Sequence, residues 1–89
     1  MNRILVVCIG NICRSPAAEG FFKEAFQKNN IACRVDSAGL SAMVGHEADL
    51  AVRDIMLEDN HINLSSHRAK QLTEEMILQH DLILTMDFS

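Results

Sequence analysis

The feature that most constrains the fold is a short apolar run followed directly by a loop and a helix start. Residues 3–7 read Arg-Ile-Leu-Val-Val, an apolar, β-branched run that is typical of a buried strand and ends before Gly10. Ser15-Pro16 then predicts a helix start, because serine is a favoured N-cap and proline a favoured first helical residue. A strand, a tight loop and a helix in this order are typical of an α/β protein.

The rest of the chain continues this alternation. Apolar residues at helical spacing extend the first helix to residues 29–30, and alternation from residue 31 predicts a second strand ending at residues 37–39, with Cys33 in the core. Helical periodicity predicts a helix over residues 48–59. Two shorter helical pieces follow, with Ser65 or Ser66 as the candidate cap of the first and Thr73 of the second. Residues 81–86 predict a third buried strand. We expect residues 1–89 to form one domain with a Rossmann-like three-layer α/β fold, a central parallel sheet and right-handed crossovers.

Composition excludes several classes of function. The chain of 89 residues is 48% apolar and 22% charged, which is typical of a globular protein, and its net charge of −4 argues against nucleic-acid or anionic-membrane binding. No apolar run approaches the roughly 18–20 residues of a membrane helix. Three cysteines without a clear export signal predict a cytoplasmic protein with reduced thiols. The histidines show no ligand spacing, so we expect no metal and no cofactor.

Residues 8–15, here called the anion loop, carry the candidate chemistry. They read Cys-Ile-Gly-Asn-Ile-Cys-Arg-Ser and lie between the first strand and the first helix, where ligands bind in parallel sheets. The loop lacks the glycine patterns of dinucleotide and nucleotide sites. A loop that curls into a helix N-terminus points backbone N–H groups inward and forms an anion nest, and Gly10 and Asn11 tolerate the left-handed conformations that such curling needs.

The side chains of the anion loop suit phosphoryl transfer. The positive field favours the thiolate of Cys8, which would attack a bound phosphate in line and form a cysteinyl-phosphate that water hydrolyses. Arg14 offers a planar fork for two phosphoryl oxygens, and Ser15 can cap the helix and donate to the sulfur. The same spacing would also result from a buried cysteine and a solvent-exposed arginine at an ordinary helix cap, without any chemistry. The position of the loop between a strand and a helix favours the phosphate site.

Five blocks of the chain resemble the low-molecular-weight protein tyrosine phosphatases. They are Val7–Glu19, Asp36–Gly39, Val44-Gly45 with Ala48-Asp49, His67–Gln71 and Asp81–Asp87, in family order. Leu40, with Val44-Gly45 soon after it, is most similar to the bacterial members that serve capsule and exopolysaccharide tyrosine kinases. The resemblance implies hydrolysis of phosphotyrosine in proteins, with a bacterial tyrosine autokinase as a partner and inorganic phosphate or related oxyanions as ligands of the site.

The resemblance also implies roles for individual residues. Cys8 is expected to be the nucleophile, Arg14 the phosphate clamp and Ser15 the aid to the thiolate. Asn11 is expected to hold the strained turn with Ser37 and His67 as its partners. The residues expected to contact substrate are Ile9, Gly10, Asn11, Ile12, Cys13 and, along the wall beside the aromatic ring, Leu40. Cys13 is also expected to form a reversible disulfide with Cys8 under oxidation.

The family's general acid has no match in this sequence. That acid is an aspartate in an Asp-Pro-Tyr loop beyond the third strand, whereas this sequence holds one proline and no tyrosine; Asp87 belongs to another block. We therefore expect a C-terminally truncated or incompletely represented chain without the last strand and helix of the family fold. Loss of a general acid would slow hydrolysis by about 10²–10⁴-fold, and an uncovered sheet edge would invite self-association.

Two alternative functions remain open. An arsenate reductase on the same fold uses a similar anion loop but relays electrons through a further cysteine pair, and no cysteine follows Cys33 here. A non-catalytic phosphate- or phosphotyrosine-binding fragment would keep the loop without turnover.

Overall fold

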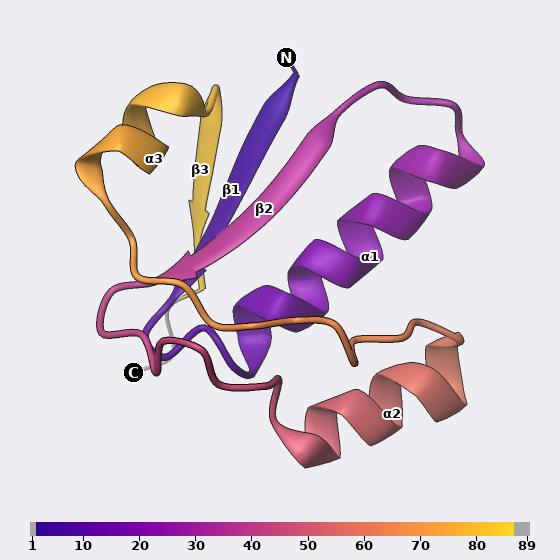
Figure 1. Cartoon of the computed structure of the whole chain (residues 1–89). Helices are drawn as coiled ribbons and strands as arrows, with labels where there is room; N and C mark the ends of the chain where they lie inside the picture. Colours follow the sequence, from indigo (N-terminus) through magenta and orange to yellow (C-terminus); the bar gives the residue numbers. More distant parts are fainter. Residues whose placement is uncertain (1, 87–89) are drawn as a thin grey trace.

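A three-stranded parallel sheet with strand order β2-β1-β3 organises the chain (Figure 1). The computed structural model describes residues 2–86. Its elements are β1 (Arg3–Cys8), α1 (Arg14–Lys28), β2 (Arg34–Gly39), α2 (Leu50–Asn60), α3 (Glu74–Gln79) and β3 (Leu82–Thr85). The predicted α/β fold with a parallel sheet is confirmed.

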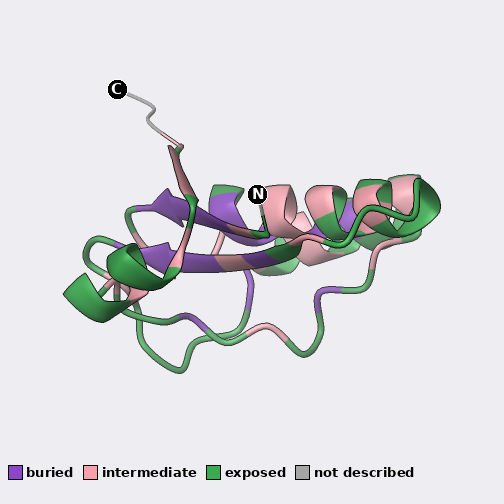
Figure 2. Cartoon of the chain, turned by 90° about the horizontal axis from the view of Figure 1, so that it is seen from above, coloured by how far each residue is buried: buried purple, intermediate pink, exposed green. Residues whose placement is uncertain are grey.

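Strand β1 is the centre of the sheet. Its pairing puts Cys8 opposite Gly39 of β2 and Val7 opposite Thr85 of β3, so the carboxyl ends of all three strands lie at one edge. Residues 4–8 are all buried, as Figure 2 shows for the colouring of this strand. The continuous apolar run is required because a central parallel strand has no face toward water.

Helices pack on both faces of the sheet. On one face, Ile4, Val6 and Val35 form a cluster with Phe22 and Phe26 of α1. The opposite face packs against α3 and the segment before it, through a cluster of Leu5, Val7 and Ala38 with Leu72, Met76 and Ile83. Helix α2 lies beside α1, held by Ala48, Met56 and Leu64 packed against Ala17, Val52 and Ile62. Cys33 is half-buried against the first of these clusters rather than fully in the core.

One predicted helical piece is absent. The segment around Ser65 and Ser66 is not helical, whereas Thr73 does cap α3 by accepting a hydrogen bond from the N–H of Met76 at 3.2 Å. The reason lies in tertiary hydrogen bonds: the N–H of Ala69 donates to the carbonyl of His46 at 2.8 Å. Backbone groups used between distant segments cannot form the i→i−4 bonds of a helix.

In the part of the chain that the structure describes, no helix combines the length and apolar character needed to span a bilayer.

A polar cluster ties the sheet to the end of α3. The Nε2 of His80 lies 2.8 Å from Oδ2 of Asp36 on β2, and its Nδ1 lies 2.6 Å from the carbonyl oxygen of Met76. Burial raises the pKa of the Asp36 carboxyl, but the hydrogen bond with His80 and the positive charges of Lys70 and Arg34 outweigh burial and leave this pKa below its usual value. The carboxylate is therefore the stabilising form.

Removal of this carboxylate should change how stability depends on pH. Because the pKa of Asp36 is lower in the folded than in the unfolded chain, its contribution is present above about pH 4 and is lost as pH falls through the lowered pKa. The Asp36→Asn variant should therefore unfold at lower urea concentration than wild type at pH 7, with the difference shrinking as pH falls below about 4. A difference in unfolding free energy that is the same at every pH would contradict this role.

Candidate active site

The anion loop lies where β1 ends and α1 begins. Helix α1 starts at Arg14 with Cys13 as its N-cap, and no side chain caps it. The prediction that Ser15 is the N-cap and Pro16 the first helical residue is therefore wrong. The helix begins earlier because the loop curls into it directly, and the hydroxyl of Ser15 is turned toward the sulfur of Cys8 instead.

The Cys8 sulfur is buried and has two polar neighbours. The hydroxyl of Ser15 lies 2.9 Å from Sγ, and the backbone N–H of Asn11 donates to Sγ at 3.2 Å. Cys8 itself is 5% exposed. An N–H and a hydroxyl directed at one sulfur can stabilise negative charge on it, which is what a thiolate nucleophile needs.

Asn11 holds the turn of the anion loop. It is fully buried and adopts the left-handed conformation with φ 59°, whereas Gly10, for which the same conformation was expected, is not among the residues with positive φ. Its Nδ2 donates to the hydroxyls of Ser15 at 2.8 Å and Ser37 at 3.0 Å, and its Oδ1 accepts from the N–H of Lys70 at 2.8 Å. Because every donor and acceptor of the side chain is used, the strained turn is stabilised from three segments.

The structure brings Ser37 and His67 against Asn11, as the resemblance implies. The Nε2 of His67 lies 2.7 Å from the carbonyl oxygen of Asn11. Ser37 also donates to Oε1 of Glu19 at 2.5 Å, and Oε2 of Glu19 accepts from Lys23 at 2.5 Å. Glu19 is a residue that the sequence reasoning missed as a site residue. Its position one helical turn after Ser15 is the signal that could have found it, because residues four apart share a helix face.

Arg14 and Cys13 lie at the junction of loop and helix. Arg14 is exposed at the first position of α1. Burial raises the pKa of the Cys13 thiol, and the negative charges of Asp49 and Cys8 raise it further. The positive charge of Arg14 lowers this pKa, but by less. The thiols of Cys8 and Cys13 are both free in this structure.

An apolar rim lies beside the loop. The N–H groups of Leu40, Ser41 and Met43 donate to the carbonyls of residues 8, 9 and 10 at 2.9, 2.9 and 3.1 Å, so residues 40–43 run along the anion loop. Ile9 and Leu40 are 57% and 58% exposed. Met43 and Val44 are exposed too, and the sequence reasoning missed them as rim residues. Exposed apolar side chains at this position can contact an aromatic group attached to a bound phosphate.

Comparison with known proteins identifies the family. Residues 3–89 match the family described as low molecular weight phosphotyrosine protein phosphatase. The chain belongs to this family.

Individual phosphatases of the family agree with this assignment. The chain is 48% identical over 87 residues to AmsI of Erwinia amylovora, named as a probable low molecular weight protein-tyrosine-phosphatase, and this covers 98% of the chain and 57% of AmsI. A low molecular weight protein tyrosine phosphatase from T. tengcongensis superposes with a TM-score of 0.94 at 38% identity, covering 97% of this chain and 58% of that one. The tyrosine phosphatase Wzb from Escherichia coli K30, crystallised with sulphate, superposes with a TM-score of 0.86 at 36% identity, covering 98% and 57%. The chain therefore spans little more than half the length of these phosphatases.

The expectations about a metal site and about Asp87 concern residues other than the anion loop. Within residues 2–86, no group of histidine, cysteine, aspartate and glutamate side chains is arranged to hold a metal ion. Asp87, which the sequence reasoning did not assign to the acid role, lies outside the described residues.

Gly39 provides a test of how tightly the loop is packed. A Cβ added there would lie 2.5 Å from the carbonyl oxygen of Ile9 and 3.1 Å from Cβ of Asn11. Since the first contact is with backbone, Gly39→Ala should displace the anion loop, lower the free energy of unfolding by about 1–3 kcal/mol and weaken phosphate binding. Thermal unfolding and phosphate titration measure these effects.

Gly10→Ala is the matched control for this substitution. A Cβ at Gly10 would make only ordinary contacts, 3.7 Å from Cγ1 of Ile12 and 4.0 Å from Cγ of Met43. The control should lose much less stability than Gly39→Ala. Equal losses in the two variants would show that the close approach of Gly39 to Ile9 does not hold the loop.

Proposed function

We propose that this chain carries the nucleophile and phosphate-binding loop of a protein tyrosine phosphatase that acts through a cysteinyl-phosphate on Cys8. The observation that carries the proposal is the buried sulfur of Cys8 at the start of a helix, with the Ser15 hydroxyl 2.9 Å away and the Asn11 N–H donating at 3.2 Å. A helix N-terminus favours bound anions, so nucleophile and phosphate are attracted to the same place. Membership of the phosphatase family supports the same reaction.

The reaction proceeds in two displacements. The N–H groups of the anion loop and the guanidinium of Arg14 hold the phosphoryl oxygens while the Cys8 thiolate attacks phosphorus. The P–S bond forms as the bond from phosphorus to the tyrosine oxygen breaks, and that oxygen takes a proton from a general acid, so that tyrosine leaves as the neutral phenol. Water then attacks phosphorus, inorganic phosphate leaves and the thiolate is restored, stabilised by the Ser15 hydroxyl. The proposal assigns the acid role to no residue between 2 and 86.

The rim supports an aryl phosphate as substrate. The side chains of Ile9 and Leu40, 57% and 58% exposed, can contact an aromatic ring attached to the phosphate. Being apolar, they offer no hydrogen bond or ion pair to a charged leaving group. The proposal therefore takes phosphotyrosine in a protein as the substrate, with a bacterial tyrosine autokinase as the expected partner and the cytoplasm as the location. Cys13, beside Cys8 in the loop, is proposed as its disulfide partner under oxidation.

The nucleophile is tested with an aryl phosphate that has a good leaving group. Such a substrate needs little help from a general acid, so the chain should form a phosphoenzyme even where the acid is absent. Rapid quench with ³²P-labelled aryl phosphate should trap about one phosphate per chain, and Cys8→Ser should reduce turnover by at least ~10³-fold. Trapping in Cys8→Ala, which has no nucleophilic atom at this position, equal to wild type would refute the assignment, and tight phosphate binding without phosphoenzyme would indicate a binding fragment.

The phosphate clamp is tested by oxyanion affinity. Arg14→Ala should weaken vanadate binding by about 10–100-fold, since a hydrogen bond to a charged group contributes about 1.5–3 kcal/mol. Arg14→Lys keeps the positive charge but loses the planar guanidinium, so its vanadate affinity should lie between those of wild type and Arg14→Ala. Arg34→Ala is the matched control: it removes the same charge from the first residue of β2, which pairs with Arg3 at the end of the sheet opposite the loop. Isothermal titration measures all four proteins.

A further inference from the structure

The carboxamide of Gln71 is bonded to the backbone of residues 40–43, the segment that runs along the anion loop. Its Nε2 donates to the carbonyl of Leu40 at 2.9 Å, and its Oε1 accepts from the N–H of Ala42 at 2.9 Å. One planar amide thus pairs with the two backbone groups that flank Ser41, as the backbone of a neighbouring strand would. No step of the proposed reaction uses Gln71.

The backbone N–H groups of residues 40–43 have two kinds of partner. Three of the four donate to carbonyls of the anion loop, whereas that of Ala42 donates to Gln71. Residues 40–43 belong to no helix or strand, so no hydrogen-bond ladder of their own fixes their course. The conformation of this segment therefore depends on the anion loop and on one side chain from elsewhere in the chain.

Gln71 itself projects from a backbone that is held on both sides. The N–H of Lys70 donates to Oδ1 of Asn11 at 2.8 Å, and the carbonyl of Lys70 accepts from the N–H of Gly39 at 2.9 Å. The N–H of Leu72 donates to the carbonyl of Gly39 at 2.8 Å, which completes a parallel bridge between Gly39 and Gln71. The origin of the Gln71 side chain is therefore fixed by the sheet and by the anion loop.

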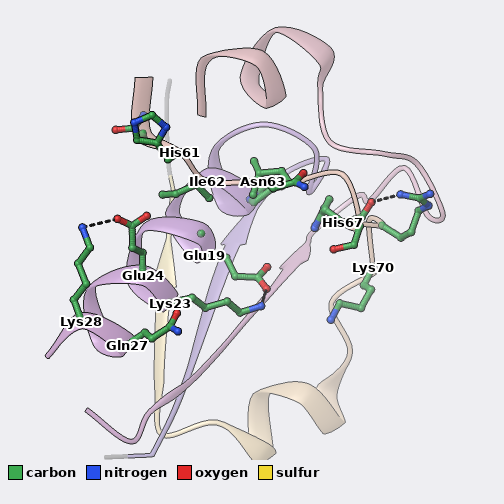
Figure 3. Close-up of a pocket in the computed structure, with 16 residues that line it drawn as sticks. Glu19, Lys23, Glu24, Gln27, Lys28, His61, Ile62, Asn63, His67 and Lys70 are labelled. Atoms are coloured by element: carbon green, nitrogen blue, oxygen red, sulfur yellow. Dashed lines mark hydrogen bonds and ion pairs between the residues drawn. The ribbon is translucent and has the colours of Figure 1, made fainter. Parts of the chain in front are cut away.

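The residues before Gln71 lie between α1 and the anion loop. His67 and Lys70 line a groove between α1 and residues 60–70, as Figure 3 shows. The Nε2 of His67 lies 2.7 Å from the carbonyl oxygen of Asn11. A segment that is held in this way can position one that lacks regular structure.

Leu40 depends on its backbone for its position. Its side chain is 58% exposed, so packing does little to hold it. Its N–H donates to the carbonyl of Cys8 at 2.9 Å, and its own carbonyl accepts from Gln71. A backbone fixed at both groups presents the side chain at one place, which lowers the entropy that is lost when a ligand contacts it.

We propose that Gln71 is a positioning residue for aromatic substrates, because its carboxamide fixes the backbone that carries Leu40 beside the anion loop. The inference rests on the proposed function, in which Leu40 contacts the ring of phosphotyrosine. The anion loop keeps its own support, since the side chain of Asn11 bonds to Ser15 and Ser37. Loss of the Gln71 bonds should therefore weaken binding of the ring and spare binding of the phosphate.

Two phosphonates that resist hydrolysis test this proposal. Benzylphosphonate has an aromatic ring and methylphosphonate has none, so the ratio of their affinities measures what the rim contributes. Gln71→Met keeps the length of the side chain but removes the amide, and it should lower this ratio about threefold to tenfold, as expected for the net loss of one hydrogen bond. The affinity for methylphosphonate should change by less than about twofold. Titrations followed by the amide chemical shifts of the anion loop measure both affinities.

Gln79→Met is the matched control. Gln79 is an exposed residue of α3, and its carboxamide donates to Oε1 of Glu75 on the same helix at 3.1 Å. The control makes the same chemical change away from the rim and should keep the wild-type ratio. An equal fall of the ratio in Gln79→Met and Gln71→Met would overturn the proposal.

A double-mutant cycle tests whether Gln71 acts through Leu40. The ratio should already be low in Leu40→Ala, and addition of Gln71→Met should lower it by less than about twofold more, because residues that act as a unit are not additive. A full additional loss in the double variant would show that Gln71 acts on the ligand by another route.

Amide hydrogen exchange tests the contact without any ligand. In Gln71→Met the N–H of Ala42 loses its acceptor and should exchange about threefold to tenfold faster. The N–H of Ser41, which donates to the anion loop, should change by less than about twofold. Exchange at Ala42 equal to that of wild type would refute the contact on which the inference stands.

The outcomes separate this inference from the proposed function. A wild-type protein that binds both phosphonates, with a ratio unchanged in Gln71→Met, would refute the positioning role and keep the phosphate site. Equal loss of both ligands in Gln71→Met would also refute it, because Gln71 would then support the whole loop rather than the rim. A wild-type protein that binds neither phosphonate would refute the proposed function and this inference with it.

Discussion

The hydrogen bonds of the Asn11 side chain are the interaction on which the site depends. They connect Asn11 to Ser15 at the start of α1, to Ser37 of β2 and to the backbone of Lys70, while Asn11 keeps φ at 59°. Asparagine adopts the left-handed conformation more readily than most residues other than glycine, and the buried partners that satisfy its amide hold the turn in place. Two distant segments, β2 at Ser37 and the chain at Lys70, must therefore be in place before Cys8 acquires its surroundings.

The sheet supplies those positions. Because β1 is buried on both faces and pairs in parallel with β2 and β3, the carboxyl ends of the strands meet where the loop begins. The pairing of Cys8 with Gly39 brings residues 39–43 along the loop, which places the exposed Leu40 next to Ile9. A rigid core thus carries a polar site whose apolar rim faces water.

The local patterns predicted the elements better than their ends. The apolar run of β1 and the Thr73 cap were readable because burial and capping leave direct marks in composition. The start of α1 was misplaced, since Ser15 has the residue type of an N-cap but its hydroxyl bonds to Cys8. The predicted helix at Ser65 or Ser66 failed because the neighbouring backbone bonds to residues far away in the chain.

By itself the sequence determined the order of strands and helices, the α/β class and the position of Cys8 and Arg14 in one loop, because these follow from local periodicity and from residue types at short spacing. Only the tertiary structure decided which groups surround that loop. The contact of Glu19 with Ser37 and the groove between α1 and residues 60–70 join segments far apart in the chain. Local patterns do not encode such contacts, because they arise when the sheet and helices pack and bring their side chains together.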